Sequence, residues 1–154
     1  MKTNLMRIQT GLLFFCLFLF SSAFANSETK AIEQAYYSWC SAIGTAKGDA
    51  KVITAFYAPD AVLLPTLSSE ILLNHRGEMD HYFVVLTNKP NIHCKTNALA
   101  TRVEGDVAIN SGRYTFSYTD KGHMKSIPAR FSFVYKKYGD NWLIINHHSS
   151  KLPE

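Results

Sequence analysis

The stretch that decides the fold is residues 124–150, MKSIPARFSFVYKKYGDNWLIINHHSS. Aromatic and β-branched residues recur on both sides of Gly139-Asp140-Asn141, as is typical of two strands joined by a tight turn. The stretch therefore predicts a long antiparallel hairpin, with strands over residues 124–137 and 142–150.

The residues before this hairpin repeat the same pattern. Residues 92–103 and 107–118 predict two further strands, because Glu104-Gly105-Asp106 and Asp120-Lys121-Gly122 supply residues that favour turns. Together the four segments predict a four-strand meander that fills the second half of the chain.

The first half of the mature chain is predicted to be mainly helical. Residues 28–43 carry one apolar stripe with helical spacing. Its members are Ile32, Ala35, Tyr36, Trp39 and Ile43. A short helix is expected from Asp49 through Tyr57, ended by residues 58–60, and a third helix is expected over residues 76–86. Between them, residues 61–64 predict a short buried strand.

Helices followed by a meander indicate an α+β fold class. Strands of ten or more residues curl strongly when they pack on helices. We therefore expect N-terminal helices packed on a strongly curved antiparallel sheet, which makes a cone with one open mouth. That mouth is the natural place for a pocket.

The N-terminal residues predict export. Lys2 and Arg7 precede an apolar run over residues 11–20, and Ala23-Phe24-Ala25 follows as a cleavage site. Residues 1–25 are thus predicted to be a signal peptide cut after Ala25, and residues 26–154 a single domain. The alternative is an uncleaved anchor, but the run is only half of the ~20 residues that span a bilayer. A periplasmic or secreted protein with no membrane attachment after cleavage is expected.

Composition excludes several other classes of function. The chain has 16 Lys and Arg against 12 Asp and Glu, and loss of Lys2 and Arg7 leaves the mature domain only slightly basic. Without a basic cluster, no nucleic-acid partner is expected. Glycine-rich phosphate loops and common hydrolase and zinc motifs are also missing from the sequence.

Cys40 and Cys94 remain after signal cleavage, in a chain bound for an oxidising compartment. Their spacing is compatible with one disulfide or with two buried thiols. Because a domain of this size does not need a covalent link, we expect free thiols.

The last strand carries the most unusual polar residues. Strand alternation sends Asn146, His148 and Ser150 to one face, and His147 and Ser149 to the other. One histidine is therefore expected to face the pocket. A simpler interpretation places both histidines at the surface or at a dimer interface.

Three further residues are candidates for the site. Thr66 follows a buried strand near the expected pocket rim, although a capping role is common for threonine. Tyr82 lies beside an apolar helical stripe, where it either points its hydroxyl into a cavity or simply packs. Arg130 lies in an aromatic strand and either faces solvent or meets an anion.

Several segments resemble the association-domain branch of the nuclear-transport-factor-two-like, or SnoaL-like, superfamily. They are AFYAPDAVL (55–63) followed by PT (65–66), SGRYTF (111–116) and ARFSFVY (129–135). The resemblance covers nearly all of residues 28–153. It implies the cone-shaped cystatin-like fold, and by analogy a homodimer, but it does not by itself imply an activity.

The C-terminal HHSSKLP (147–153) resembles the His-His-His-Ser-Ser-x-x-Pro signature of iota-class carbonic anhydrases, with Asn146 in place of the first histidine. This resemblance implies reversible hydration of carbon dioxide to bicarbonate. It implies a metal-independent reaction at Thr66, Tyr82 and Ser149 or Ser150, with zinc or manganese as the alternative cofactor.

His148 is expected to relay the released proton. Arg130, His147 and Tyr114 are expected to bind substrate, in an apolar cone lined by Trp39, Phe83 and Phe133.

Two alternatives remain open. One is a non-catalytic exported domain that binds a small ligand or dimerises, which a sealed apolar pocket would favour. The other is a SnoaL-like isomerase or cyclase, which needs a carboxylate or histidine base deep in the cone. Converging threonine, tyrosine and serine hydroxyls would favour the anhydrase instead.

Overall fold

A computed structural model describes residues 27–153 of the chain. The predicted signal peptide and its cleavage site lie outside these residues. The first helix covers residues 27–45 of the described chain. It is followed by α2 (Lys51–Thr54), β1 (Tyr57–Leu64), β2 (Leu72–Leu73), a 3₁₀ turn (Asn74–Arg76), α3 (Glu78–Thr87), β3 (His93–Glu104), β4 (Val107–Asp120), β5 (His123–Tyr138) and β6 (Asn141–Lys151).

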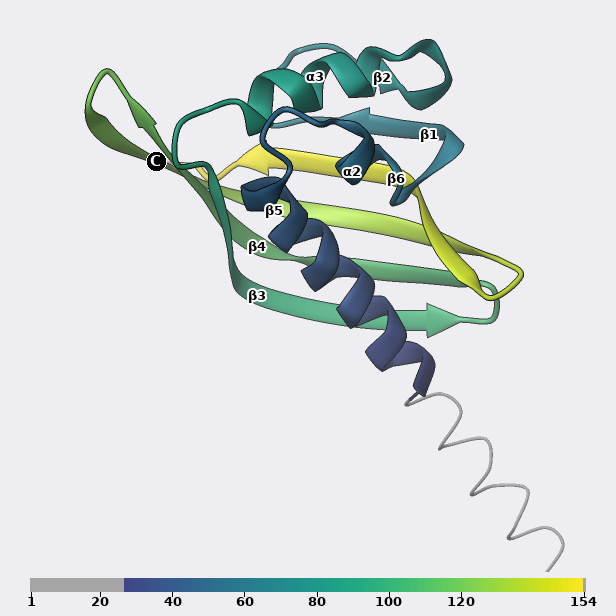
Figure 1. Ribbon diagram of the computed structural model, residues 1–154. Helices are drawn as coiled ribbons and strands as arrows, with labels where there is room; N and C mark the ends of the chain where they lie inside the picture. The colour runs from purple at the N-terminus through teal and green to yellow at the C-terminus, as the bar shows by residue number, and fades with distance from the viewer. Residues whose placement is uncertain (1–26, 154) are drawn as a thin grey trace, which may run out of the picture.

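The strands form one sheet in the order β2-β1-β6-β5-β4-β3. The first helix lies diagonally across one face of this sheet, and α3 lies near β2 and β1 at one end of the strand order (Figure 1). The predicted α+β class and the four-strand meander are confirmed, with strand ends within a few residues of the expected ones. Among the described residues, no helix is both long and apolar enough to cross a membrane.

The sheet is mixed, whereas the sequence predicted an antiparallel one. The meander is antiparallel throughout, but β1 runs parallel to β6, with Val62 opposite Asn146 and Leu64 opposite His148. The parallel pair follows from the order of the elements. β1 comes after the N-terminal helices, and α3 separates it from the meander, whose last strand, β6, lies beside β1. This pairing brings Thr66, just after β1, close to the end of β6.

The second helix is shorter than expected. It ends at Thr54, and Tyr57 already begins β1, where the sequence predicted helix through Tyr57. Phe56 accepts a backbone hydrogen bond from Ile144 of β6, so strand pairing competes successfully with the helical tendency. Pro59, which has no N–H to donate, falls within a shift of register between Tyr57 and Val62.

The third helix also begins later than predicted. Residues 74–76 form a 3₁₀ turn, Gly77 adopts the left-handed conformation with φ of 72°, and α3 starts at Glu78. Within α3, Met79, Phe83 and Leu86 are buried as the stripe predicted. Tyr82 lies at the edge of this buried stripe and is half-buried.

The core lies between the first helix and the sheet. Ile32, Tyr36, Trp39 and Ile43 of the helical stripe are all at most 1% exposed. They pack against inward-facing aromatic residues of the meander: Tyr114, Phe116, Phe131, Phe133 and Tyr135. Burial of such large apolar surfaces is the main stabilising contribution to a domain of this size.

The curvature of the meander is supported at Gly112. A Cβ atom at this position would lie 2.1 Å from the Ala98 carbonyl oxygen and 2.9 Å from the Phe131 ring. The close approach coincides with an irregularity of β3 between Thr96 and Ala98, where the strand bends. Only glycine permits this contact, which explains the glycine in an otherwise bulky strand.

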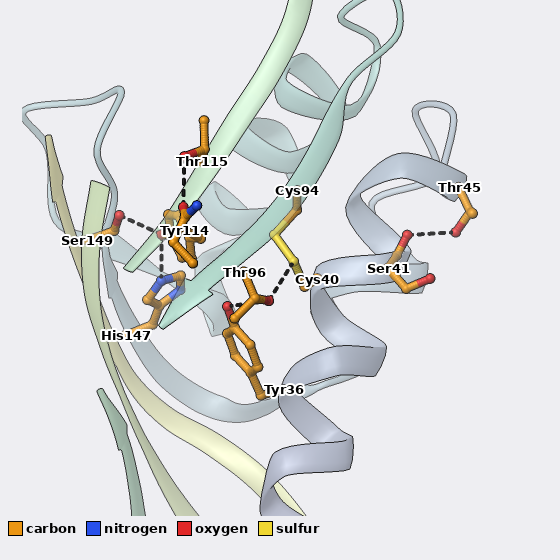
Figure 2. The surroundings of a disulfide bond; sticks show 11 residues. Tyr36, Cys40, Ser41, Thr45, Cys94, Thr96, Tyr114, Thr115, His147 and Ser149 are labelled. Atoms are coloured by element: carbon orange, nitrogen blue, oxygen red, sulfur yellow. Dashed lines mark hydrogen bonds between the residues drawn. A yellow bond between two sulfur atoms is a disulfide. The ribbon is translucent and has the colours of Figure 1, made fainter. Parts of the chain in front are cut away.

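A disulfide joins Cys40 of the first helix to Cys94 of β3, so the expectation of two free thiols is wrong (Figure 2). The Cα atoms are 5.4 Å apart, within the range that a disulfide spans. Packing of the helix across the sheet brings together two cysteines that are 54 positions apart in the chain. Size alone was therefore a poor guide to cysteine pairing.

Candidate functional site

A small cavity lies between the first helix, α3 and the inner face of the sheet. Its volume is about 10 Å³. Its lining combines apolar side chains with a few hydroxyls and one imidazole: Trp39, Leu63, Pro65, Thr66, Tyr82, Phe83, Leu86, Tyr114, Phe116, His147 and Ser149. None of these residues is acidic or basic apart from the histidine, so the cavity is uncharged while that imidazole is neutral.

Four polar side chains form a continuous chain of hydrogen bonds along the cavity wall. The Tyr114 hydroxyl donates to Ser149 Oγ over 2.5 Å and lies 3.5 Å from His147 Nε2 (Figure 2). Ser149 Oγ is in turn hydrogen-bonded to Thr66 Oγ1. The chain thus links β4 and β6 to the loop that follows β1.

Tyr57 extends this chain at its buried end. Its hydroxyl lies 2.9 Å from His147 Nδ1, and Tyr57 itself is 4% exposed. The sequence pattern gives no indication that Tyr57 is a site residue. The pattern predicts a helix there, in which the Tyr57 hydroxyl has no relation to the last strand.

The His147 imidazole is enclosed by aromatic rings. It stacks on Phe133 with ring centres 3.8 Å apart and meets Trp39 edge-on at 5.3 Å. Burial lowers the pKa of His147 to about 3, with a smaller contribution from the nearby His148. The ring is therefore neutral at neutral pH, with one nitrogen that donates and one that accepts.

The order of donors follows from these contacts. Because Tyr114 gives its only proton to Ser149, it can only accept from His147 Nε2. The imidazole proton is thereby assigned to Nε2, and Nδ1 accepts from Tyr57. In the hydrogen bond between Ser149 Oγ and Thr66 Oγ1, either hydroxyl can be the donor. When Ser149 donates, the Thr66 proton is free to be directed onward to a ligand.

Tyr82 contributes a second donor to the same cavity. The Leu67 backbone amide hydrogen-bonds to its hydroxyl, so the Tyr82 proton remains available to a bound molecule. Burial raises the pKa of the Tyr57, Tyr82 and Tyr114 hydroxyls above the usual 10.0. All three therefore remain protonated donors at neutral pH.

The structure places the predicted site residues on two faces of the sheet. Thr66, Tyr82, Tyr114, His147 and Ser149 line the cavity together. Trp39 and Phe83 line it as expected, whereas Phe133 lies behind His147.

Three other predicted site residues lie on the opposite, outer face. Arg130, His148 and Ser150 line a separate hollow there, and Arg130 Nε donates to Ser150 Oγ over 3.1 Å. His148 is exposed, so it has no contact with the cavity through which to relay a proton. Of the two adjacent histidines, His147 is the one that faces the pocket, and the expected proton relay by His148 does not fit its place on the outer face.

Zinc or manganese ligation does not fit these side chains. His147 points into the cavity, whereas its neighbour His148 lies on the outer face with Asn146. Within residues 27–153, no group of three or more histidine, cysteine, aspartate or glutamate side chains is placed to hold a metal ion. A reaction that needs no metal therefore stays a prediction.

Comparison with known families identifies the class of protein that this fold defines. The calcium/calmodulin-dependent protein kinase II association domain family matches residues 28–153. The chain therefore belongs to this family. Comparison with curated proteins gives no match.

Solved structures agree with this assignment. A protein from Xanthomonas campestris, described as a candidate association domain of this family, is 38% identical, with a TM-score of 0.73 over 80% of this chain and 87% of its own. The association domain of the C. elegans kinase has 14% identity and a TM-score of 0.66, covering 82% and 97%.

A candidate dehydratase of the NTF2-like family from Streptomyces avermitilis has 16% identity and a TM-score of 0.72, covering 84% of this chain and 99% of its own. At these low identities, the second and third likenesses show only the NTF2-like, cystatin-like fold.

Proposed function

We propose that the cavity hydrates carbon dioxide reversibly to bicarbonate, using hydroxyl groups. The observation that carries the proposal is the convergence of the Thr66, Tyr82 and Ser149 hydroxyls on one uncharged cavity. These are the positions to which the resemblance to iota-class carbonic anhydrases assigns the reaction. Ser149, and not Ser150, is the serine at the cavity.

The size of the cavity favours a small substrate. A volume of about 10 Å³ is close to the minimum that holds one water molecule. A molecule of a few atoms fits after small side-chain adjustments, whereas a bulky isomerase or cyclase substrate requires rearrangement of the core. Apolar walls formed by Trp39, Phe83 and Phe116 also suit a neutral gas.

The order of hydrogen bonds suggests how the residues act. The Thr66 and Tyr82 protons donate to the oxygens of carbon dioxide, on which negative charge grows as water oxygen bonds to carbon. Ser149, held by Tyr114, fixes the direction of the Thr66 hydroxyl. One proton leaves the attacking water and passes to solvent at the half-buried Thr66 and Tyr82, because His148 lies on the other face.

A stopped-flow assay with a pH indicator tests this proposal on the purified mature protein after treatment with a chelator. Carbon dioxide hydration above the buffer rate is expected. Thr66→Ala and Tyr82→Phe are each expected to reduce kcat by about 100-fold, the usual cost of removing one donor to a developing charge. Ser149→Ala is also expected to reduce kcat, because Ser149 fixes the direction of the Thr66 hydroxyl. Ser150→Ala is the matched control and should retain the rate, because Ser150 faces the outer hollow.

Three outcomes would contradict the proposal. If the protein is inactive both with and without added zinc or manganese, it is not a carbonic anhydrase. If only the metal-loaded protein is active, then the hydroxyl groups do not suffice and the metal-independent reaction is wrong. If Ser149→Ala and Ser150→Ala reduced kcat equally, the reaction would not take place in the cavity, because only Ser149 lines it.

The second candidate is a non-catalytic domain that serves binding or assembly. Membership of an association-domain family favours it, and the small cavity whose hydroxyls already bond to one another is compatible with it. Crystals soaked in bicarbonate distinguish the two. Density among Thr66, Tyr82 and Ser149 supports the anhydrase, and an undisturbed hydrogen-bond chain in an inactive protein supports assembly.

The third candidate function is that of a dehydratase or isomerase, and one feature supports it, the buried His147 in the cone. A base is most effective when its pKa lies near the working pH. Because burial lowers the pKa of His147 to about 3, this imidazole is a weak proton acceptor. The third candidate therefore has less support than the other two.

A further inference from the structure

The outer face of the sheet, opposite the first helix, carries a compact group of polar side chains over β4, β5 and β6. Paired residues of an antiparallel sheet point to the same face, so the register places them side by side. We call this group the arginine face. It consists of Arg113, Arg130 and Ser150 in one row and Ser111, Ser132 and His148 in the next.

The two arginines of this face are directly opposite each other. Arg113 pairs with Arg130 across β4 and β5, and both side chains are exposed. Like charges in this arrangement repel each other. Among the ion pairs of the described residues, none includes either arginine, whereas Arg102 of β3 is paired with Glu104 at 2.6 Å. The arginine face therefore concentrates positive charge that nothing in this part of the chain neutralises.

The surface beside Arg130 is hollowed. A depression of about 130 Å³ is lined by Arg130, Phe131, Ser132, His148 and Ser150. Because Arg130 Nε donates to Ser150 Oγ, the terminal guanidinium N–H groups and the Ser150 proton can still donate to a bound molecule. The hollow thus combines positive charge with several directed donors, and its rim contains no acidic residue.

We propose that the arginine face binds a doubly charged inorganic oxyanion, of the phosphate or sulfate class. Guanidinium groups match such oxygens geometrically, and charge-assisted hydrogen bonds are stronger than neutral ones. One dianion between Arg113 and Arg130 neutralises both charges and removes their mutual repulsion. The site lies on the opposite side of the sheet from the cavity, so it does not depend on the proposed hydration of carbon dioxide.

Thermal unfolding tests the site on the mature protein at pH 7.5. Sodium phosphate and sodium sulfate are each compared with sodium chloride at equal ionic strength. Both oxyanions are expected to raise the Tm of the wild-type chain. The same comparison is made for Arg113→Gln and Arg130→Gln, with Arg102→Gln as the matched control, because Arg102 lies on the same face and already has a partner.

The two site variants are expected to lose the oxyanion effect, and NMR titration should show at least tenfold weaker phosphate binding. In chloride alone, they should melt no lower than wild type, because each removes a repulsion. The control should keep the full effect.

The site is refuted if oxyanions act no more strongly than chloride. Equal loss in Arg102→Gln would refute it too, because the effect would then follow from general charge. If Arg113→Gln differed from wild type in its molecular mass in solution, with or without phosphate, the arginine face would contact a second copy of the chain instead of an oxyanion.

Discussion

At the scale of single residues, the burial of His147 has a consequence for acid stability. Its pKa falls from the ordinary 6.5 to about 3 in the folded chain, mainly through burial. Between these values the unfolded chain binds a proton that the folded chain does not. Stability is therefore complete above pH 6.5 and decreases as the pH falls, by up to about 1.4 kcal/mol per pH unit.

We predict that His147→Asn flattens the pH dependence of the free energy of unfolding between pH 6.5 and about 5, measured by urea titration. Carboxyl groups contribute little in this window, because the pKa values of Glu28 and Asp80 lie below their ordinary 4.5 and 3.8 through hydrogen bonds to Lys137 and Lys51. His148→Asn is the control, since His148 is exposed. Equal slopes in wild type and His147→Asn would contradict the buried neutral imidazole.

At the scale of elements, the Cys40–Cys94 disulfide fixes the first helix on β3. Trp39, which precedes Cys40 in the helix, lines the cavity, so the disulfide also helps to hold the cavity wall in place. A cross-link that closes a loop of 54 positions is worth up to about 4 kcal/mol in the loop-entropy treatment.

We predict that Cys40→Ala/Cys94→Ala lowers the free energy of unfolding by about 2–4 kcal/mol, measured by denaturant titration. Dithiothreitol should lower the stability of the wild-type chain to a similar extent and leave the double variant unchanged. Insensitivity of the wild type to the reductant, with free thiols detected in the folded protein, would contradict the pairing.

At the scale of the whole molecule, family membership and fold make self-association the natural expectation. The association domain of the C. elegans kinase shares the fold. We predict that the mature protein is a homodimer, which sedimentation velocity across a concentration series can measure. A single species with the mass of one chain at all concentrations would contradict this prediction. Export after cleavage at Ala25 stays a prediction from the sequence.

Much of the fold could be predicted because its signals are local. The spacing of Ile32, Tyr36 and Trp39 reports one helix face, and turn residues mark the ends of the meander strands. Alternation likewise predicted that His147 and His148 lie on opposite faces. These patterns depend on residues a few positions apart, so they are readable without knowledge of the rest of the chain.

Contacts between distant segments required the folded chain. Alternation does not say which histidine faces inward; packing of the helix and of β1 against β6 places His147 and Ser149 in the cavity. The Tyr57–His147 hydrogen bond joins residues 90 positions apart, and the disulfide joins residues 54 apart. Local patterns specify the strands and helices, but the relative placement of those elements arises from burial of the whole core, which also selected the hydroxyl groups that meet at the site.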